Sequence, residues 1–325
     1  MTTLPELQPI FERYITVAFS SLTKDNTAIT MPLTPYVGST GTLDVSTGLT
    51  YPTKAERARR NPNVALLYFD PKGSGVSKPL TVLVQGKAAV RDHNLQANTN
   101  RYIHDSLAKI PAAMKGMPRF IMKSMGWYFA RIYIETTPAH IYWWEMGKED
   151  LAPNEWHAPD YMTYPVSDPA PQGNVPSGWK EAPLDWKTGA KSAVEHLGLP
   201  ILSINSEDGY PVMMRAKSVR LTETGFVLDM PKGITFPQYG SGTVTFSYHP
   251  ETFTGQLNAA FRGVASGNGT QINFAIQRQL SDWSAGGDNR LAGMFEFMKA
   301  SLSLRSRLAA ESARRGQPVP QVNLP

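Results

Sequence analysis

The chain carries one strand pattern twice, and this internal repeat restricts the fold more than any other feature of the sequence. From Thr16, and again from Leu199, β-branched and aromatic residues flank a short polar turn, which is typical of a β-hairpin. Further strand-like segments follow each hairpin in the same order, and the first four pairs lie about 180 residues apart. The repeat predicts two similar antiparallel β domains.

The fifth pair of segments lies closer together, roughly 140 residues apart, so the first copy carries an insertion. This insertion, from Arg91 to Trp127, has a helical pattern. About six strands in each copy favour a small closed barrel, because closure removes exposed strand edges. Two barrels in one chain predict an intramolecular pseudo-dimer, and a cleft between two similar domains is a preferred place for a ligand.

Four regions are predicted along the chain. Proline and aromatic residues between the two copies indicate an ordered strap that packs on a surface. Apolar residues at helical spacing predict a C-terminal helix from Leu291 to Leu308, and "LPELQPIFERYI" predicts a short N-terminal one. The predicted boundaries are 1–146 for the first barrel, 147–189 for the strap, 190–284 for a degenerate second barrel and 285–325 for the C-terminal helix and tail.

Composition excludes several classes of protein. Hydrophobic residues make up 41% of the chain and charged residues 18%, which indicates a globular protein with a real core. No apolar run approaches the ~18 residues that span a bilayer, and the N-terminus does not have the pattern of a secretory signal, so we expect a cytoplasmic protein. The absence of cysteine excludes disulfides, thiolate metal ligands and a cysteine nucleophile.

The net charge of +5 favours anionic partners. Basic residues are densest from Lys54 to Arg60 and at the C-terminal Arg305, Arg307, Arg314 and Arg315. Neither cluster has the interleaved aromatic residues of a single-stranded nucleic-acid groove. A small phosphorylated or carboxylated ligand therefore fits the charge pattern better than nucleic acid does.

The segment from Lys54 to Arg60 is the strongest candidate for ligand binding. Thr53 and Glu56 have the spacing of a capping box, which predicts a helix that starts at Lys54. Pro62 ends this helix after about two turns. The helix follows a connector rich in hydroxyl groups, where free backbone N–H groups can bind an anion; its members are Ser46, Thr47 and Thr50. A solvated helix without a ligand would also account for these charges.

Two observations favour the anion site. Lys54 lies in the first turn, where the helix dipole disfavours a cation, and a bound anion would explain that position. The second copy reads "PKGITFPQYGSG" at the corresponding place, with Lys232 and no arginine. A charge cluster that the barrel itself required would be present in both copies.

The motif "T-x-x-x-x-x-T-K-A-x-R-x-x-x-N-P-x-V-A-L-L", which begins at Thr47, is followed by "V-x-V-x-G-x-A". With the preceding hairpin and strand, it resembles the pyridoxamine 5′-phosphate oxidase-like family, also called the flavin/deazaflavin oxidoreductases. The resemblance covers residues 15–146 and, more faintly, 199–284. It implies split β-barrels, so the expected class is mainly β with helical additions: two tandem split β-barrels with N- and C-terminal helices.

The resemblance also implies a cofactor site between the barrels. In the family, the matching lysine and nearby hydroxyl or arginine side chains bind the cofactor phosphate, which implies Lys54 with Thr47 and Thr53 close by. Many members carry asparagine three residues after the lysine, where this chain has Arg57. The ring of the cofactor lies against the second strand and the dimer partner, which implies Thr30, Met31, Pro32 and the second barrel.

FMN is the cofactor that the resemblance implies first. A deazaflavin coenzyme is the alternative, because Arg57, Arg59 and Arg60 could hold further carboxylates. We therefore expect a flavin-type oxidoreductase that acts on a small organic substrate, in which the cofactor carries the hydride chemistry and no residue is assigned a catalytic role. A non-catalytic carrier of a flavin, haem or other planar ligand, an interaction protein with a decayed site, and a further homodimer stay open.

Two other groups of residues are of a type that occurs in functional sites. The six histidines show no paired metal-binding spacing, so no metal is predicted. Trp143 and Trp144 close the last strand of the first barrel and are interpreted as core or interface residues. One of them could flank a flat ring, because aromatic side chains stack on planar ligands.

Overall fold

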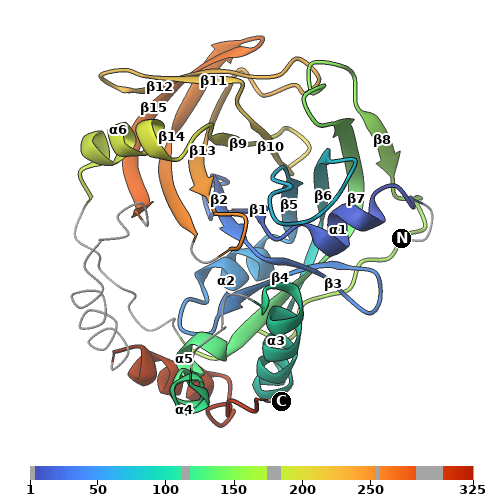
Figure 1. The fold of residues 1–325 in the computed structure, drawn as a ribbon, viewed down its shortest axis with the longest axis vertical. Helices are drawn as coiled ribbons and strands as arrows, with labels where there is room; N and C mark the ends of the chain where they lie inside the picture. Colours follow the sequence, from blue (N-terminus) through green and yellow to red (C-terminus); the bar gives the residue numbers. More distant parts are fainter. Residues whose placement is uncertain (1–3, 112–117, 174–183, 254–255, 283–302, 325) are drawn as a thin grey trace.

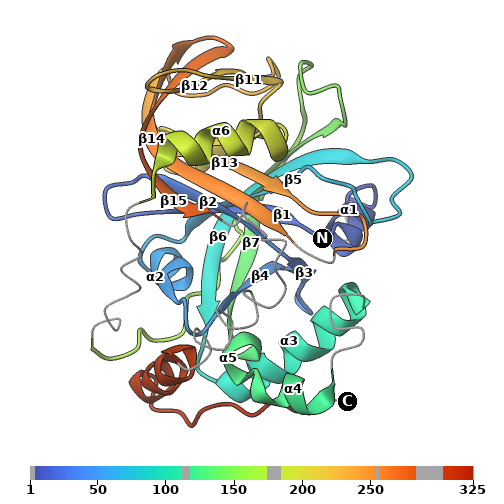
Figure 2. The ribbon, with the colours of Figure 1, turned by 60° about the vertical axis from the view of Figure 1, so that its left-hand side comes forward.

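The computed structural model describes residues 4–111, 118–173, 184–253, 256–282 and 303–324 (Figure 1). Two antiparallel sheets dominate it. In Figures 1 and 2 the second sheet, yellow to orange, lies above the first, blue to green, and helices gather at the far end of the first.

The first sheet curls around its own apolar core, and all its strand pairs are antiparallel. The order of its strands is β2-β1-β5-β6-β7-β4-β3, with β8 added on β7. These strands are β1 (Val17–Leu22), β2 (Ala28–Leu33), β3 (Pro35–Val37), β4 (Leu43–Gly48), β5 (Asn63–Tyr68), β6 (Leu80–Arg91), β7 (Arg131–Glu145) and β8 (Asn154–His157).

The second sheet repeats this topology strand for strand, in the order β10-β9-β13-β14-β15-β12-β11. Its strands are β9 (Ile201–Asn205), β10 (Pro211–Arg215), β11 (Ser218–Leu221), β12 (Gly225–Asp229), β13 (Tyr239–Tyr248), β14 (Leu257–Asn268) and β15 (Gln271–Asp282). The prediction of two tandem split barrels is confirmed. Each barrel path has one strand more than the predicted six, and the first sheet has β8 in addition. β3 and β11 span only three and four residues and are too short to show a pattern in the sequence.

A bulge at the same point of each barrel fixes the correspondence between the two copies. The register of β6 and β7 shifts between Gln85 and Gly86, and that of β14 and β15 shifts between Arg262 and Gly263. Gln85 of the first barrel therefore corresponds to Arg262 of the second. The residues opposite them, His140 and Arg278, correspond in the same way.

The apolar core of the second barrel extends into the first barrel, so the two form a pseudo-dimer within the chain. Ala18, Leu67 and Trp144 of the first barrel belong to the same apolar cluster as the core of the second. Hydroxyl groups add a polar seam, in which Thr30 Oγ1 donates to Ser203 Oγ over 2.6 Å and Thr245 Oγ1 donates to the Thr30 carbonyl over 3.1 Å. Burial and these bonds hold the barrels in one arrangement.

The helices pack outside the barrels. The predicted insertion contains α3 (Leu95–Lys109), α4 (Arg119–Ser124) and the first half of α5 (Gly126–Phe129). The remaining helices are α1 (Gln8–Arg13), α2 (Thr53–Arg60), α6 (Trp186–His196) and a helix over residues 303–314. The predicted start of the C-terminal helix, Leu291 to residue 302, lies outside the described residues. Within the described part of the chain, none of the helices is long and apolar enough to cross a membrane.

A buried ion network fastens the C-terminal helix to α2. Arg315 Nε lies 2.9 Å from Asp92 Oδ2, and Arg314 Nη2 lies 2.7 Å from Glu56 Oε1. Glu311 also pairs with both arginines. Because Glu56 lies on α2, the end of the chain fixes the position of the helix that carries the predicted ligand site.

Candidate functional site

Helix α2 is the element from which the candidate site is built. It begins at Thr53 and ends at Arg60, before an extended Asn61, as Pro62 requires. The predicted capping box is wrong, because the N-cap is Pro52 and no side chain caps the helix. Glu56, the predicted partner of Thr53, pairs instead with Arg314 and Arg315. The first turn of α2 therefore keeps its backbone N–H groups free of side-chain caps.

A cavity of about 300 Å³ lies where α2 faces the second barrel. The first barrel contributes residues of the β1–β2 hairpin and of α2, and the second contributes residues of β14 and β15. The lining residues are Thr23, Ile29, Met31, Tyr51, Thr53, Lys54, Arg57, Arg262, Arg278 and Leu280. Four of them are cations and none is a carboxylate.

Two cations of α2, Lys54 and Arg57, lack the counter-charges that several other arginines of the molecule have. Within the described part of the chain, Lys54 Nζ has no hydrogen bond or ion pair, and Arg57 has a single bond, from Nε to Ser21 Oγ over 3.1 Å. Burial, then Arg57 and Arg131, lower the pKa of Lys54 to about 8. Burial and Arg60 lower the pKa of Arg57 to about 10. A cation whose pKa is lowered in this way gains from binding an anion.

Arginines outside the cavity behave in the opposite way. Hydrogen bonds and charges from Asp44 raise the pKa of Arg101, although burial opposes them. Glu56 and Glu311 likewise raise the pKa of Arg314 against the effect of burial. Arg101 and Arg314 are thus paired with carboxylates, whereas Lys54 and Arg57 face a cavity whose lining has none. This contrast marks the cavity as an anion site.

The second barrel adds two cations from the opposite wall. Arg262 Nη2 contacts Asp25 Oδ2 at 2.5 Å and Thr27 Oγ1 at 3.1 Å, so it is partly neutralised. Arg278 is exposed and has no ion pair with a described residue. The cavity therefore spans both barrels and needs side chains from each.

Four of the seven predicted site residues line this cavity: Met31, Thr53, Lys54 and Arg57. The other three lie elsewhere. Thr30 is buried in the seam between the barrels, where its N–H donates to Thr243 Oγ1. Thr47 is buried in β4 and its Oγ1 donates to the Tyr51 carbonyl over 3.0 Å, so it supports a residue of the lining. Pro32 pairs with Ala18 in the sheet and is not part of the lining.

The predicted arginine face for further carboxylates is not present as a unit. Arg59 points away from the cavity, and its Nη2 lies 2.8 Å from Asp92 Oδ1. Arg59 also donates to the carbonyl of Asp168 in the strap. Arg60 Nη2 donates to the Leu22 carbonyl over 3.2 Å. Arginines on successive helix positions project in different directions, so Arg57 alone reaches the cavity.

Sequence reasoning missed Arg262 and Arg278. Both lie in the second copy, at positions where the first copy has Gln85 and His140. The signal was the bulge glycine that follows Arg262, because an alignment anchored on Gly86 and Gly263 places an arginine beside the cleft in one copy only. Within the described residues, no group of three or more histidine, aspartate or glutamate side chains could hold a metal.

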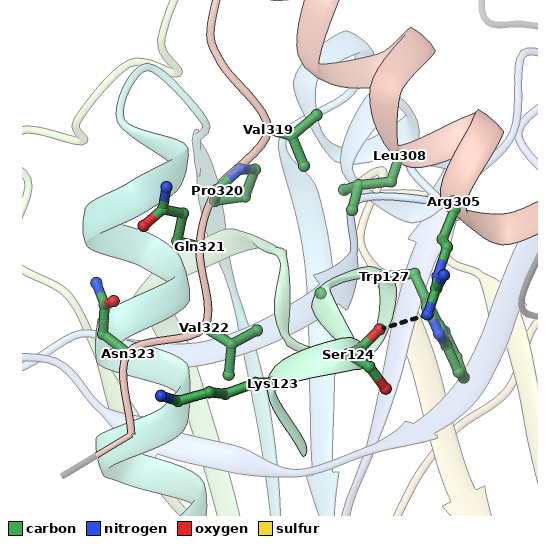
Figure 3. A pocket seen from close by; sticks show the side chains of 11 residues that line it. Lys123, Ser124, Trp127, Arg305, Leu308, Val319, Pro320, Gln321, Val322 and Asn323 are labelled. Atoms are coloured by element: carbon green, nitrogen blue, oxygen red, sulfur yellow. Dashed lines mark hydrogen bonds between the residues drawn. The ribbon is translucent and has the colours of Figure 1, made fainter. Parts of the chain in front are cut away.

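A larger cavity, of about 470 Å³, lies beside the C-terminal tail (Figure 3). Trp127 and Lys123 face the tail residues Pro320 and Val322 across it, and Arg305 Nη2 donates to the Ser124 carbonyl over 3.3 Å. The lining of this cavity includes no residue of either sheet and none of the predicted site residues. The cavity beside α2 is therefore the better candidate.

The lowered pKa of Lys54 predicts how anion binding depends on pH. The ammonium group is charged at pH 7 and loses its proton as the pH rises through about 8. We expect the affinity for a phosphate ligand to fall by up to about tenfold per pH unit above that point, while a Lys54→Ala variant shows no such fall. In the ligand-free protein, the stability contributed by Lys54 changes with pH in the opposite direction. The unfolded chain holds this proton up to about pH 10.5, so the contribution to stability rises from about pH 8 to 10.5. Titrations with FMN at several pH values and constant ionic strength test this, and a parallel pH profile in both proteins would contradict it.

No family model matches this sequence, and no curated protein matches it. Solved structures do show a likeness. One is a protein from Listeria innocua described as a candidate pyridoxamine 5′-phosphate oxidase, with 18% identity over 42% of this chain and 94% of that chain and a TM-score of 0.29. A second is an F420 reductase, with 17% identity over 41% of this chain and 92% of that chain and a TM-score of 0.31. A third is a Clostridium acetobutylicum protein of the pyridoxinephosphate oxidase family, with 13% identity over 48% of this chain and 94% of that chain and a TM-score of 0.32. The first and third of these structures are described with the name of the family that residues 15–146 resemble. At these identities the likeness concerns the fold alone.

Proposed function

We propose that the cavity beside α2 binds the phosphate end of a flavin-type cofactor, and that the protein is an FMN- or deazaflavin-dependent oxidoreductase acting on a small organic molecule. One observation carries this proposal: four cations from both barrels line a cavity that has no carboxylate in its lining. Such a site is built for a ligand with concentrated negative charge.

The residues present fit the two ends of such a cofactor. Lys54 and Arg57 can make charge-assisted hydrogen bonds to a phosphate, and the uncapped first turn of α2 offers N–H groups beside the Thr53 hydroxyl. Ile29, Met31, Tyr51 and Leu280 supply the apolar wall that a flat ring needs. The volume of about 300 Å³ matches the lower end of small-molecule sites.

The chain's own part in the reaction is to bind, orient and shield. A bound flavin or deazaflavin would supply hydride transfer. The lining has no histidine, aspartate or glutamate, and we assign no catalytic role to its titratable Lys54 and Tyr51. Lys54 and Arg57 would fix the phosphate, and the apolar wall would exclude water from the face of the ring that it covers.

FMN is the first choice of cofactor, and a deazaflavin coenzyme is the alternative. Because Arg59 and Arg60 are engaged with the protein, they do not support an extended anionic tail. Arg262 and Arg278 on the opposite wall could take that role. Both FMN and a deazaflavin coenzyme are therefore compared in the binding experiment.

Binding and turnover together test the proposal. FMN, riboflavin and a deazaflavin coenzyme are titrated into the protein, and the loaded protein is then offered a nicotinamide donor and a panel of small acceptors. The proposed function predicts tight binding of a phosphorylated ring and reduction of at least one acceptor. Binding without turnover would indicate a carrier. Failure of all three compounds to raise the melting temperature would overturn the cofactor site.

The second barrel offers a matched control for the lysine. Lys232 lies in the loop between β12 and β13, where the structure has no counterpart of α2, and it is exposed. Its backbone N–H donates to Asp150 Oδ1 over 2.9 Å. We expect Lys232→Ala to leave FMN affinity unchanged in the same titration. A loss as large as that of Lys54→Ala would mean that the two barrels carry equivalent sites.

A further inference from the structure

The pseudo-dimer has a second cavity, of about 240 Å³, at the position that its internal symmetry relates to the cavity beside α2. Each cavity is formed by a β-hairpin of one barrel and by two long strands of the other. In the second cavity the hairpin is β9–β10 and the long strands are β6 and β7. Its lining residues are Leu83, Gln85, Tyr142, Trp144, Pro153, Ser206, Asp208, Val212, Gly233, Ile234 and Thr235.

The charge of the second cavity is opposite to that of the first. Its lining has no lysine or arginine, and its one charged residue is Asp208. The position of Arg262 is taken by Gln85, and that of Arg278 by His140. Burial and the neighbouring His157 lower the pKa of His140, which disfavours the charged form of this imidazole. A phosphate ligand would therefore find no cation in this lining.

Asp208 has no arginine partner in the described residues, whereas its counterpart Asp25 pairs with Arg262. The two hairpin turns are built alike, because Thr23 Oγ1 donates to Asp25 Oδ1 in one and Ser206 Oγ donates to Asp208 Oδ1 in the other. Asp25 pairs with Arg262 at 2.5 Å. Asp208 has no ion pair with a described residue, and Gln85 Nε2 donates to the Pro211 carbonyl instead. A carboxylate at the rim is thus left without its cation.

The walls of the cavity suit a flat ring. Trp144 is held by a hydrogen bond from its Nε1 to the Leu151 carbonyl over 3.0 Å, and Tyr142 lies on the same face of β7. Leu83, Val212 and Ile234 complete an apolar surface. Aromatic walls attract cations through their π faces and stack on planar rings.

We propose that this second cavity binds a small aromatic amine, with Asp208 as counter-ion in the place of the missing arginine and with Tyr142 against the ring, above the buried Trp144. This site does not depend on what the cavity beside α2 binds. The volume allows a molecule of one or two rings. The chain would then hold an anionic ligand on one side of its pseudo-twofold axis and a cationic ligand on the other.

Three probes with one ring system and different charges test this site: tryptamine, indole and indole-3-acetate. Ligand-observed NMR titrations should show tryptamine binding at least fivefold more tightly than indole-3-acetate, with indole between them. Asp208→Asn, which keeps the acceptor for Ser206 and the Tyr210 N–H, should remove the preference for tryptamine and leave indole unchanged. Ile234→Trp, which fills the cavity, should weaken all three probes at least fivefold, and Lys54→Ala should affect none.

A further variant restores the pattern of the other cavity. Gln85→Arg should pair with Asp208 as Arg262 pairs with Asp25, and tryptamine should then bind no better than indole-3-acetate. If this buried substitution prevents folding, as circular dichroism would show, Asp208→Asn and Ile234→Trp still decide. Equal affinity for tryptamine and indole-3-acetate, binding that neither variant changes, or no binding of any probe would overturn the proposal.

Discussion

Lys54→Ala is expected to weaken FMN binding about 10- to 150-fold, which corresponds to about 1.5–3 kcal/mol for a charge-assisted hydrogen bond to phosphate. Riboflavin has the same ring without the phosphate, and its affinity should stay the same. The two ligands therefore separate loss of the phosphate contact from damage to the ring pocket. Fluorescence titration of both flavins, on the variant and on the parent protein, measures the effect.

The fold should tolerate this substitution. Lys54 has no hydrogen bond or ion pair within the described residues, so its removal leaves no partner unsatisfied. Its lowered pKa also means that the charged form is unfavourable in the ligand-free protein. We expect an unchanged or slightly higher melting temperature without FMN. Equal FMN affinity in variant and parent would show that Lys54 does not contact the phosphate.

Arg315→Ala is expected to lower the free energy of unfolding by about 3–5 kcal/mol, because it removes a buried cation from two buried carboxylates and leaves them only Arg59 and Arg314 as partners. The Arg315 side chain is 2% exposed and lies between Asp92 and Glu311, which are 3% and 2% exposed. Its Nη2 also lies 3.4 Å from Glu56 Oε1 on α2. Denaturation by urea, followed by circular dichroism, measures the loss.

An exposed ion pair provides the control for that variant. Lys148 and Glu145 are 57% and 69% exposed, and pairs of this kind contribute about 0–1 kcal/mol. Lys148→Ala should therefore hardly move the unfolding midpoint. If Arg315→Ala were equally mild, the network would not anchor the C-terminal helix to α2. Because Glu56 belongs to the same helix as Lys54, we also expect Arg315→Ala to weaken FMN binding in the protein that stays folded.

The repeat could be predicted because strands of five or more residues bury alternate or continuous apolar faces. β1 and β5 are almost fully buried and read as strands at once. β3 and β11 escaped prediction because three or four residues carry no period. The capping box failed for a different reason. The Glu56 carboxylate could accept from a local backbone N–H or pair with two arginines from the C-terminal region. The sequence does not show that these distant arginines lie near Glu56.

The same contrast between local sequence patterns and distant contacts applies to the residues of the candidate site. Lys54 and Arg57 belong to one motif of nearby residues, so the sequence alone could place them in one candidate site. Thr30 and Met31 were proposed together, but neighbours on a strand point to opposite faces, and Met31 lines the cavity while Thr30 lies in the seam between the barrels. Arg262 and Arg278 required the packing of one barrel against the other, which depends on contacts between residues more than 200 positions apart.

Native mass spectrometry of the chain after incubation with excess FMN, with an absorption spectrum of the same sample, tests the proposed site most directly. The cavity beside α2 has four cations in its lining and the symmetry-related cavity has none, so one FMN should be retained per chain, and Lys54→Ala should lose it. No retained flavin or deazaflavin, or two retained equally well, would contradict a single phosphate site beside α2.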